Sequence, residues 1–203
     1  MSEFEFSSVK NKSEGLFKDR GSKFIAYLFP MGSVEDFKEG LNEVKQLHPT
    51  ARHFCYAYRI GLKGEEYRAN DDGEPSGSAG MPILNQLLSA NITNVGAVVV
   101  RYFGGTKLGV SGLINAYKVS VAEAIAENEI VTRELLIRAK LVFEYPVMSD
   151  VMNLLKRLDV NIIDQQFELS AEVIIEIDQS FEDQFNQELS AIDGVKYEKV
   201  KVY

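Results

Sequence analysis

The apolar segment at residues 95–103 constrains the fold more than any other part of the chain. It reads VGAVVVRYF, an almost uninterrupted run of β-branched and aromatic residues, which is typical of a strand in the interior of a sheet. A glycine-rich turn, GGTKLG, follows at residues 104–109, and a helix is expected from about residue 111 to 128. The first half of the chain is therefore built around a strand, a glycine turn and a helix.

The segments on either side of this unit predict a mixed α/β domain. Ser33 is a good helix N-cap, and Asp36 stands three residues later, as in a capping box. The polar segment DDGEPSGSAG at residues 71–80 contains too many glycine, serine and proline residues for regular structure. The other predicted elements are strands at residues 24–30, 53–60 and 65–70, the last two as a hairpin, and helices at residues 33–48 and 82–90.

The last 70 residues follow a different pattern. Their order of elements is β-α-β-β-α-β, which is the ferredoxin-like arrangement. We expect a domain boundary near residues 129–133, an N-terminal α/β domain at residues 1–132, a C-terminal domain at residues 133–203, and an α+β fold class for the whole chain. The predicted strands are residues 135–145, 161–167, 172–178 and 195–203, and the predicted helices are residues 149–158 and 181–192.

The charge of the chain is divided unequally between the two predicted domains. The 203 residues have a formal net charge of −8, and residues 133–203 hold 8 Lys+Arg against 14 Asp+Glu. Residues 1–132 hold 14 Lys+Arg against 16 Asp+Glu, so their net charge is only −2. The field of the whole molecule does not attract nucleic acid, and we expect no sequence-specific DNA binding. A basic groove in the first domain is compatible with this distribution.

The sequence also indicates where the protein acts. No apolar run approaches the ~20 residues that cross a bilayer, and the N-terminal segment does not have the pattern of a secretory signal. A single cysteine, Cys55, excludes disulfides within the chain and agrees with a reducing compartment. We expect a cytoplasmic protein with no membrane contact.

The glycine turn is a candidate phosphate-binding or RNA-binding loop. The backbone N–H groups of Gly104 and Gly105 can approach an anion closely, and Lys107 adds a mobile positive charge. Just before the turn, Arg101 can bind phosphate through two nitrogens and Tyr102 can stack on a base. The spacing is not that of a Walker A loop. The alternative is that the glycines only allow a tight turn against a neighbouring strand.

Three carboxylates in the polar loop are candidates for catalysis. Asp71, Asp72 and Glu74 lie within four residues, and clustered oxygens suit a hard cation such as Mg²⁺. Paired carboxylates can also act as acid and base. The alternative is an exposed turn in which the Asp side chains cap nearby backbone groups. We predict no dedicated metal site and no cofactor, with Mg²⁺ as the one ion these residues could hold.

The strand at residues 53–60 carries two different faces. His53 and Cys55 point the same way, so His53 is a candidate base beside a thiol, and packing is the alternative role for Cys55. Tyr56 and Tyr58 share the other face, where aromatic rings can stack bases or pack under a helix. Arg59, beside them, is a further candidate for contact with phosphate.

Three segments together resemble the YigZ/IMPACT family of small cytoplasmic proteins. They are HFCYAYRI at residues 53–60, NDDGEPSGSAGMPIL at residues 70–84, and VVVRYFGGTKLGVSGLINAY at residues 98–117. One departure is Ser111, which stands where the family usually has the first glycine of Gly-Gly-Leu, and serine at a helix start is a competent cap. A second is Ser78, which stands where threonine is common.

The resemblance implies a fold and a biological setting. The first domain should be similar to one ribosomal-protein domain and to domain IV of elongation factor G, and the second to the ferredoxin-like domains of that factor. Eukaryotic family members regulate translation through a partner of the amino-acid-starvation kinase, but they carry a different extra domain. Bacterial members look like translation-associated or nucleic-acid-binding proteins. The family offers no agreed catalytic residues.

Three functions follow as hypotheses, and the third is a protein-interaction module that uses the sheet face of the second domain. The first is a non-enzymatic protein that binds RNA or the ribosome through the motif loops of the first domain, with Lys18, Arg20 and Lys23 extending the basic surface. The acidic second domain would then contact a protein or orient the first. The alternative is an enzyme acting on a phosphorylated small molecule or nucleotide, with the carboxylates of the polar loop and the lysine-glycine loop as its site.

Overall fold

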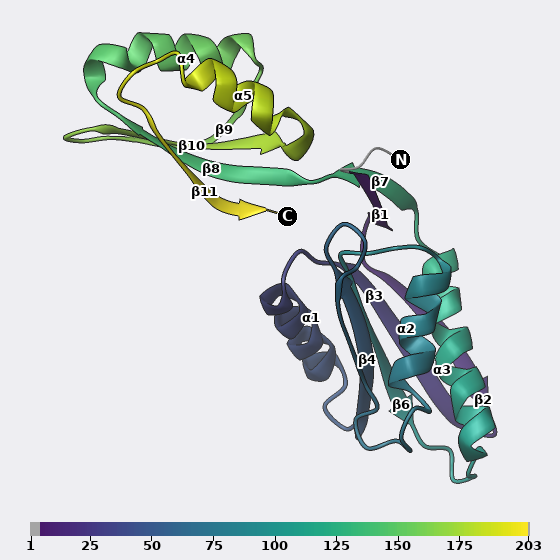
Figure 1. Ribbon diagram of the computed structural model, residues 1–203. Helices are drawn as coiled ribbons and strands as arrows, with labels where there is room; N and C mark the ends of the chain where they lie inside the picture. The colour runs from purple at the N-terminus through teal and green to yellow at the C-terminus, as the bar shows by residue number, and fades with distance from the viewer. Residues whose placement is uncertain (1–4, 203) are drawn as a thin grey trace. The chain divides into compact units, whose positions relative to one another are not determined.

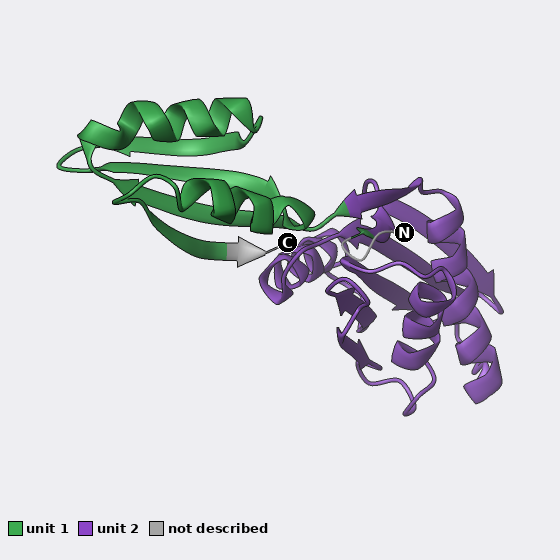
Figure 2. Cartoon of the chain, turned by 45° about the horizontal axis from the view of Figure 1, so that its top comes forward, with its two compact units in different colours: residues 1–5, 134–203 green, residues 6–133 purple. Residues whose placement is uncertain are grey.

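The computed structural model describes residues 5–202 and divides the chain into two compact units (Figure 2). The larger unit is Phe6–Arg133, and the smaller unit begins at Glu134 and includes Glu5. The fold is mixed, with antiparallel sheets and five α-helices among the described residues, which agrees with the predicted α+β class. No helix in this part of the chain is long and apolar enough to cross a membrane.

The larger unit is built on a sheet with β6 at its centre. In the described residues this sheet has the strand order β2-β3-β6-β4-β5, and every pair is antiparallel. All residues of β6 except the last are buried, which confirms the prediction of an interior strand. The strands are β2 (Ser13–Asp19), β3 (Ser22–Pro30), β4 (His53–Ile60), β5 (Glu66–Asn70) and β6 (Val95–Tyr102).

Helices cover both faces of this sheet (Figure 1). α2 (Gly80–Ser89) and α3 (Gly109–Ala126) lie on one face, and α1 (Val34–Leu47) lies on the other. The predicted cap of α1 is confirmed, because the hydroxyl of Ser33 accepts a hydrogen bond from the backbone N–H of Asp36 at 3.2 Å. The two faces of β6 therefore enter two separate apolar clusters.

Three strands of the larger unit were not predicted. β1 (Glu5–Val9) and β7 (Ile130–Glu134) pair as a short two-stranded sheet, and β2 forms one edge of the main sheet. The sequence of β2, SEGLFKD, is rich in charge and contains Gly15, so it does not look like a strand. The glycine is required by packing, because a methyl group there would lie 2.2 Å from the carbonyl oxygen of Ser120 in α3.

The smaller unit has the predicted order of elements, β-α-β-β-α-β. Its sheet has the order β11-β8-β10-β9, and α4 and α5 cover one face of it (Figure 1). The last strand was predicted to reach Tyr203, which lies outside the described residues. The elements are β8 (Leu136–Phe143), α4 (Met148–Arg157), β9 (Asn161–Phe167), β10 (Ala171–Asp178), α5 (Glu182–Leu189) and β11 (Lys196–Val202).

The glycine turn after β6 packs against the turn between β2 and β3. A methyl group on Gly104 would lie 2.0 Å from the carbonyl carbon of Gly21 and 2.2 Å from the backbone nitrogen of Ser22. The N–H of Gly104 donates to the hydroxyl of Ser22 at 3.0 Å. Two loops that are 82 residues apart in the sequence are thus held together by this hydrogen bond, at a contact so close that Gly104 has no room for a side chain.

We expect Gly104→Ala to lower the free energy of unfolding by about 2–3 kcal/mol, because the two loops must separate to admit the methyl group. Gly105→Ala is the matched control. Gly105 has a φ of 88° and open space around it, so its substitution should cost about 1 kcal/mol of backbone strain. Urea unfolding of both variants measures the difference. Equal losses would show that the contact between the loops does not matter.

Candidate functional site

A cavity of about 690 Å³ lies at the end of the sheet where β6 ends. Arg101 near the end of β6 is opposite Phe24 of β3 on one side and His53 of β4 on the other. Residues directly opposite each other in a sheet share a face, so these side chains form one row. The chain segments before β4, after β5, after β6 and at the start of α3 line the cavity with Arg52, His53, Glu74, Arg101, Phe103, Lys107, Leu108, Val110 and Leu113, among others.

A buried ion pair lies at this cavity. Nη1 of Arg101 donates to both carboxylate oxygens of Glu74, at 2.6 and 2.8 Å, and the two side chains are only 9% and 4% exposed. The hydroxyl of Tyr117 in α3 donates to the same carboxylate at 2.8 Å. The guanidinium lies 5.5 Å from the ring centroids of both Phe24 and Phe103. Glu74 therefore neutralises Arg101 and ties the polar loop to the sheet and to α3.

Cys55 continues this buried network away from the cavity. Its sulfur lies 3.2 Å from the hydroxyl of Tyr117 and 2.9 Å from the carbonyl oxygen of Asp71. Burial raises the pKa of the Cys55 thiol to about 12, and burial likewise raises the pKa of Tyr117. At neutral pH the thiol stays protonated, so Cys55 does not act as a nucleophile there.

Asp71 organises the polar loop. Its carboxylate accepts three backbone N–H bonds, from Gly77 at 2.8 Å, Ala79 at 2.9 Å and Gly80 at 2.8 Å. Burial acts to raise the pKa of Asp71, but the three hydrogen bonds outweigh it and the pKa is lowered. The carboxylate thus holds the loop in one conformation up to the start of α2.

Asp72 also binds backbone. Its carboxylate accepts a hydrogen bond of 2.6 Å from the N–H of Phe54 at the start of β4. The carboxylates of Asp71, Asp72 and Glu74 therefore have separate partners, and those of Asp71 and Asp72 bind backbone N–H groups, as in the alternative of a turn with capping Asp side chains. In residues 5–202 no group of three or more His, Cys, Asp or Glu side chains is placed to hold a metal ion.

His53 lines the cavity in a defined tautomer. Its Nδ1 lies 2.9 Å from the carbonyl oxygen of Asp72, and a carbonyl can only accept. Nδ1 therefore carries the proton, and in the neutral ring Nε2 is an acceptor. The sulfur of Cys55 bonds to other groups, so the two residues do not form a base-and-thiol pair.

The candidate residues in and before the glycine turn do not all face the cavity. The N–H of Gly104 is used by Ser22, as described above, while Gly105 and Lys107 are exposed and Lys107 lines the cavity. The hydroxyl of Tyr102 lies 2.9 Å from Nδ1 of His48, which follows α1. The ring of Tyr102 therefore packs on the α1 side of the sheet, opposite to Arg101.

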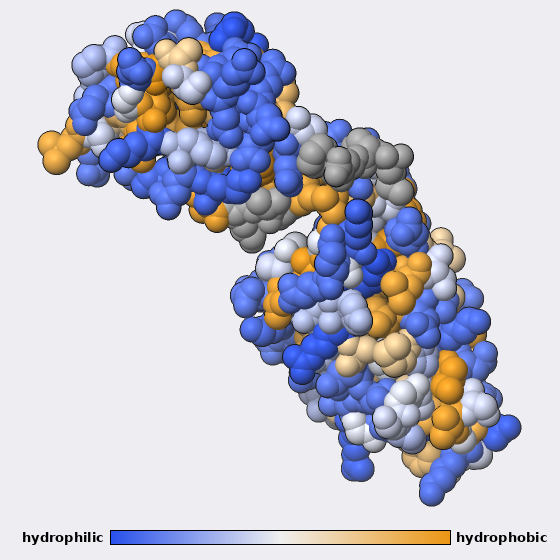
Figure 3. All heavy atoms as spheres, in the orientation of Figure 1, coloured by the Kyte–Doolittle hydropathy of each residue, from blue (hydrophilic) through white to orange (hydrophobic). Residues whose placement is uncertain are grey.

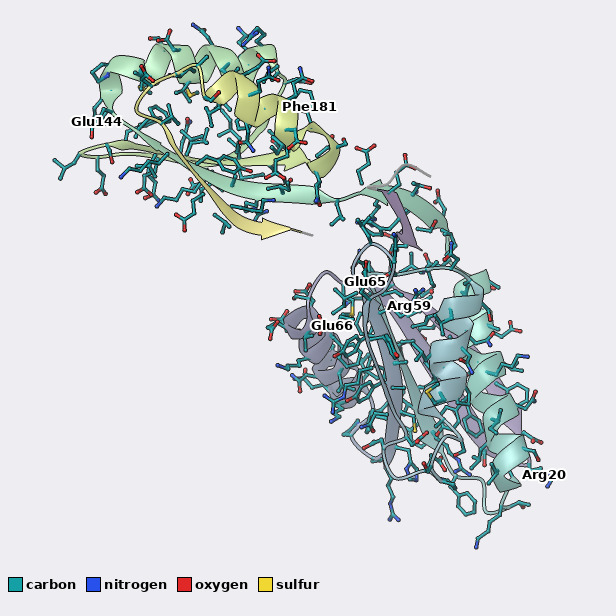
Figure 4. All side chains as sticks on the ribbon, in the orientation of Figure 1. Arg20, Arg59, Glu65, Glu66, Glu144 and Phe181 are labelled. Atoms are coloured by element: carbon teal, nitrogen blue, oxygen red, sulfur yellow. The ribbon has the colours of Figure 1, made fainter. Side chains whose placement is uncertain are left out.

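Three candidate residues of β4 do not reach the cavity. The rings of Tyr56 and Tyr58 pack against Phe37 of α1, with centroids 4.9 Å apart, because alternate residues of a strand face opposite sides. Arg59 donates to the carbonyl oxygens of Ile92 and Lys63, at 2.6 and 2.7 Å. It lies at the end of the sheet opposite to Arg20 (Figure 4).

Several cavity residues were missed by reasoning from the sequence, among them Phe103, Arg52 and the apolar residues at the start of α3. Phe103 is 57% exposed, and its ring lies over Arg101. Arg52 is exposed just before β4. An aromatic residue directly after a buried strand was a signal for Phe103, whereas Arg52 had none until the loops were placed together.

We expect Arg101→Met to lower the free energy of unfolding by about 3–5 kcal/mol, because it leaves the buried carboxylate of Glu74 without its cation. The double variant with Glu74→Gln removes both charges. Its loss in free energy of unfolding should therefore be smaller than the sum of the two single losses by at least about 1 kcal/mol. Urea unfolding of the four proteins gives the coupling energy. Additive losses would contradict the ion pair.

The lowered pKa of Asp71 predicts a pH-dependent contribution to stability. The folded protein binds the proton less readily than the unfolded chain, so the contribution is complete above the unfolded pKa of about 4. It is lost as the pH falls through the lower folded pKa. The difference in stability between wild type and Asp71→Asn should therefore be largest near neutral pH and shrink in acid. A difference that is constant from pH 2 to 7 would contradict the hydrogen-bonded carboxylate.

Comparison with known proteins places these features in a family. Residues 20–125 match the Impact N-terminal domain. The chain is 35% identical over 185 residues to an IMPACT family member of Haemophilus influenzae, covering 88% of this chain and 89% of the relative. It is 36% identical over 149 residues to YigZ of Escherichia coli, covering 72% of this chain and 73% of the relative.

A solved structure resembles the whole chain. It is the crystal structure of a protein described as hypothetical, with a TM-score of 0.76 and 27% sequence identity, and the match covers 98% of each chain. The matched domain spans the sheet, the polar loop and the glycine turn that form the cavity. On the domain match and the identity to its relatives, the chain belongs to the IMPACT family.

Proposed function

We propose that this protein is a cytoplasmic, translation-associated regulator that binds RNA, free or within the ribosome, through the cavity end of its larger unit. The observation that carries the proposal is a group of exposed cations around this end of the sheet. Arg52 and Lys107 line the cavity, whereas Lys18 and Lys23 stand opposite each other on the α1 face of the same end, in one row with Tyr102. In residues 5–202 no acidic side chain forms an ion pair with any of these cations. The cations are Lys18, Arg20, Lys23, Arg52 and Lys107, hereafter the basic end.

The acidic side chains near the basic end do not cancel its charge. Glu74 is neutralised by Arg101. The backbone hydrogen bonds of Asp71 and Asp72 leave their negative charges in place, so with Asp19 three carboxylates stand against five cations and the group stays net positive. Asp19 is the remaining carboxylate of the β2–β3 turn and is partly buried. Phosphates of RNA are the natural partners of unpaired lysine and arginine side chains.

The aromatic residue at this end supports RNA over a simple anion. Phe103 exposes its ring beside the cations, and exposed rings bind unpaired bases by stacking. Membership in the IMPACT family adds the biological setting, because the resemblance of the sequence implies a role in translation. The sheet order β11-β8-β10-β9 with both helices on one face supports a ferredoxin-like fold for the smaller unit, as the resemblance implies.

The enzymatic alternative is favoured by one observation, the volume of the cavity. About 690 Å³ is in the range of sites for small organic ligands. In this alternative Asp71, Asp72 and Glu74 would hold Mg²⁺ or transfer protons. Their hydrogen bonds to the protein explain the fold of the loop instead, so the proposal of a binding protein accounts for more of the site.

We expect Lys107→Ala to weaken the binding of single-stranded RNA and to reduce the slope of log K against log salt by about 0.7, the effect of one lost phosphate contact. Lys118→Ala is the matched control, since Lys118 is exposed on α3 five residues, more than one turn, beyond Leu113, the last residue of α3 that lines the cavity. Fluorescence anisotropy across a salt series measures both. Equal affinities and slopes for wild type and Lys107→Ala would exclude Lys107 from the interface.

A further inference from the structure

The cavity has two kinds of wall. Its lining includes both apolar and cationic side chains, and a volume of about 690 Å³ is more than a lone phosphate needs. In Figure 3 apolar side chains reach the surface of the larger unit over α2 and α3. A ligand that fills this cavity must therefore combine a flat or apolar part with an anionic part. The apolar wall is Phe103, Leu108, Val110 and Leu113, and the cationic wall is Arg52 and Lys107.

The start of α3 adds anion-binding groups at the same place. Gly109 and Val110, the first residues of this 18-residue helix, line the cavity. The N-cap residue, Leu108, makes no side-chain capping bond, and the first turn has no acidic residue. The N–H groups of the first turn therefore have no partner from a capping side chain, and the positive end of the helix dipole lies beside Lys107.

A buried donor beside the cavity also lacks an acceptor. The side chain of Arg101 is nine-tenths buried and lines the cavity, yet its Nε has no hydrogen-bond partner. Nη1 is used by Glu74. Buried donors are nearly always paired, so this Nε is an exception. Its surface is closed, and a ligand in the cavity would reach it only after a shift of the surrounding side chains.

We propose that the cavity holds one nucleotide unit, with its phosphate at Lys107, Arg52 and the start of α3, and its base against Phe103 and the apolar wall. This inference rests on the proposed function and specifies it: the RNA is recognised through an unpaired or terminal nucleotide. The same chemistry is found in a free nucleoside monophosphate. The concave, partly apolar shape does not suit the backbone of a duplex, whose bases are stacked and paired.

His53 gives the base a polar partner. Because Nδ1 donates to Asp72, the neutral ring offers Nε2 as an acceptor at the cavity wall. An exocyclic amino group of adenine, cytosine or guanine is the matching donor.

The test uses the full chain and three probes: a labelled single-stranded RNA hexamer, the same sequence in a blunt duplex, and unlabelled nucleoside 5′-monophosphates as competitors. We expect the single strand to bind more tightly than the duplex, and the monophosphates to compete. Val110→Trp fills the cavity and should weaken the binding of the hexamer about tenfold or more, which is the effect of losing one stacking contact. Phe103→Leu, which removes the ring without adding bulk, should do the same.

Ile114→Trp is the matched control, because Ile114 is exposed one turn further along α3 and does not line the cavity. The affinity of this variant for the hexamer should stay within about twofold of that of wild type, as for other surface changes. Thermal melting checks that each variant is folded.

Each contrary result identifies which proposal fails. If Lys107→Ala weakens RNA binding but neither Val110→Trp nor Phe103→Leu does, the nucleotide site is wrong and RNA binding stands. If monophosphates bind and no RNA does, RNA binding is wrong and the cavity is a site for free nucleotides. If neither class binds, both proposals are overturned.

Discussion

The larger unit depends on the burial of one guanidinium. Arg101 occupies a position of β6 that faces the apolar layer under α2 and α3, where an unpaired charge would be costly. Glu74 supplies the opposite charge from a loop that has no regular structure, and Tyr117 joins it from α3. The loop, the sheet and the helix are thus fixed to one another by a single polar cluster. The cavity lies where these three segments meet.

The loop that carries Glu74 is itself ordered by a second carboxylate. Asp71 binds three backbone N–H groups, so the loop presents Glu74 in one position. The residues that looked most like catalytic acids are therefore the ones that build the site. What they leave open to a ligand is a cationic wall, an exposed aromatic ring and an uncapped helix start. This arrangement is suited to binding phosphate and base, and its charge is local, in a chain whose net charge is negative.

The elements with a strong periodic or apolar pattern could be predicted from the sequence. The interior strand β6, the capped helix α1 and the βαββαβ order of the smaller unit all follow from spacing and local propensity. The edge strand β2 could not, because its charged residues face solvent and its glycine is explained only by the close approach of α3. The short pair β1 and β7 joins segments more than 120 residues apart, which no local pattern can show.

The same contrast applies to the candidate site, where some features could be predicted from the sequence and others could not. The sequence by itself determined the three motifs, the family and the residue types around the glycine turn, because these depend on local order along the chain. Only the tertiary structure decided which of them meet. Strand alternation sends Tyr56 and Tyr58 under α1, and strand length places Arg59 at the far end of the sheet. Folding brings Arg52 and Phe103 to the cavity instead, because packing, and not sequence spacing, determines which side chains share a surface.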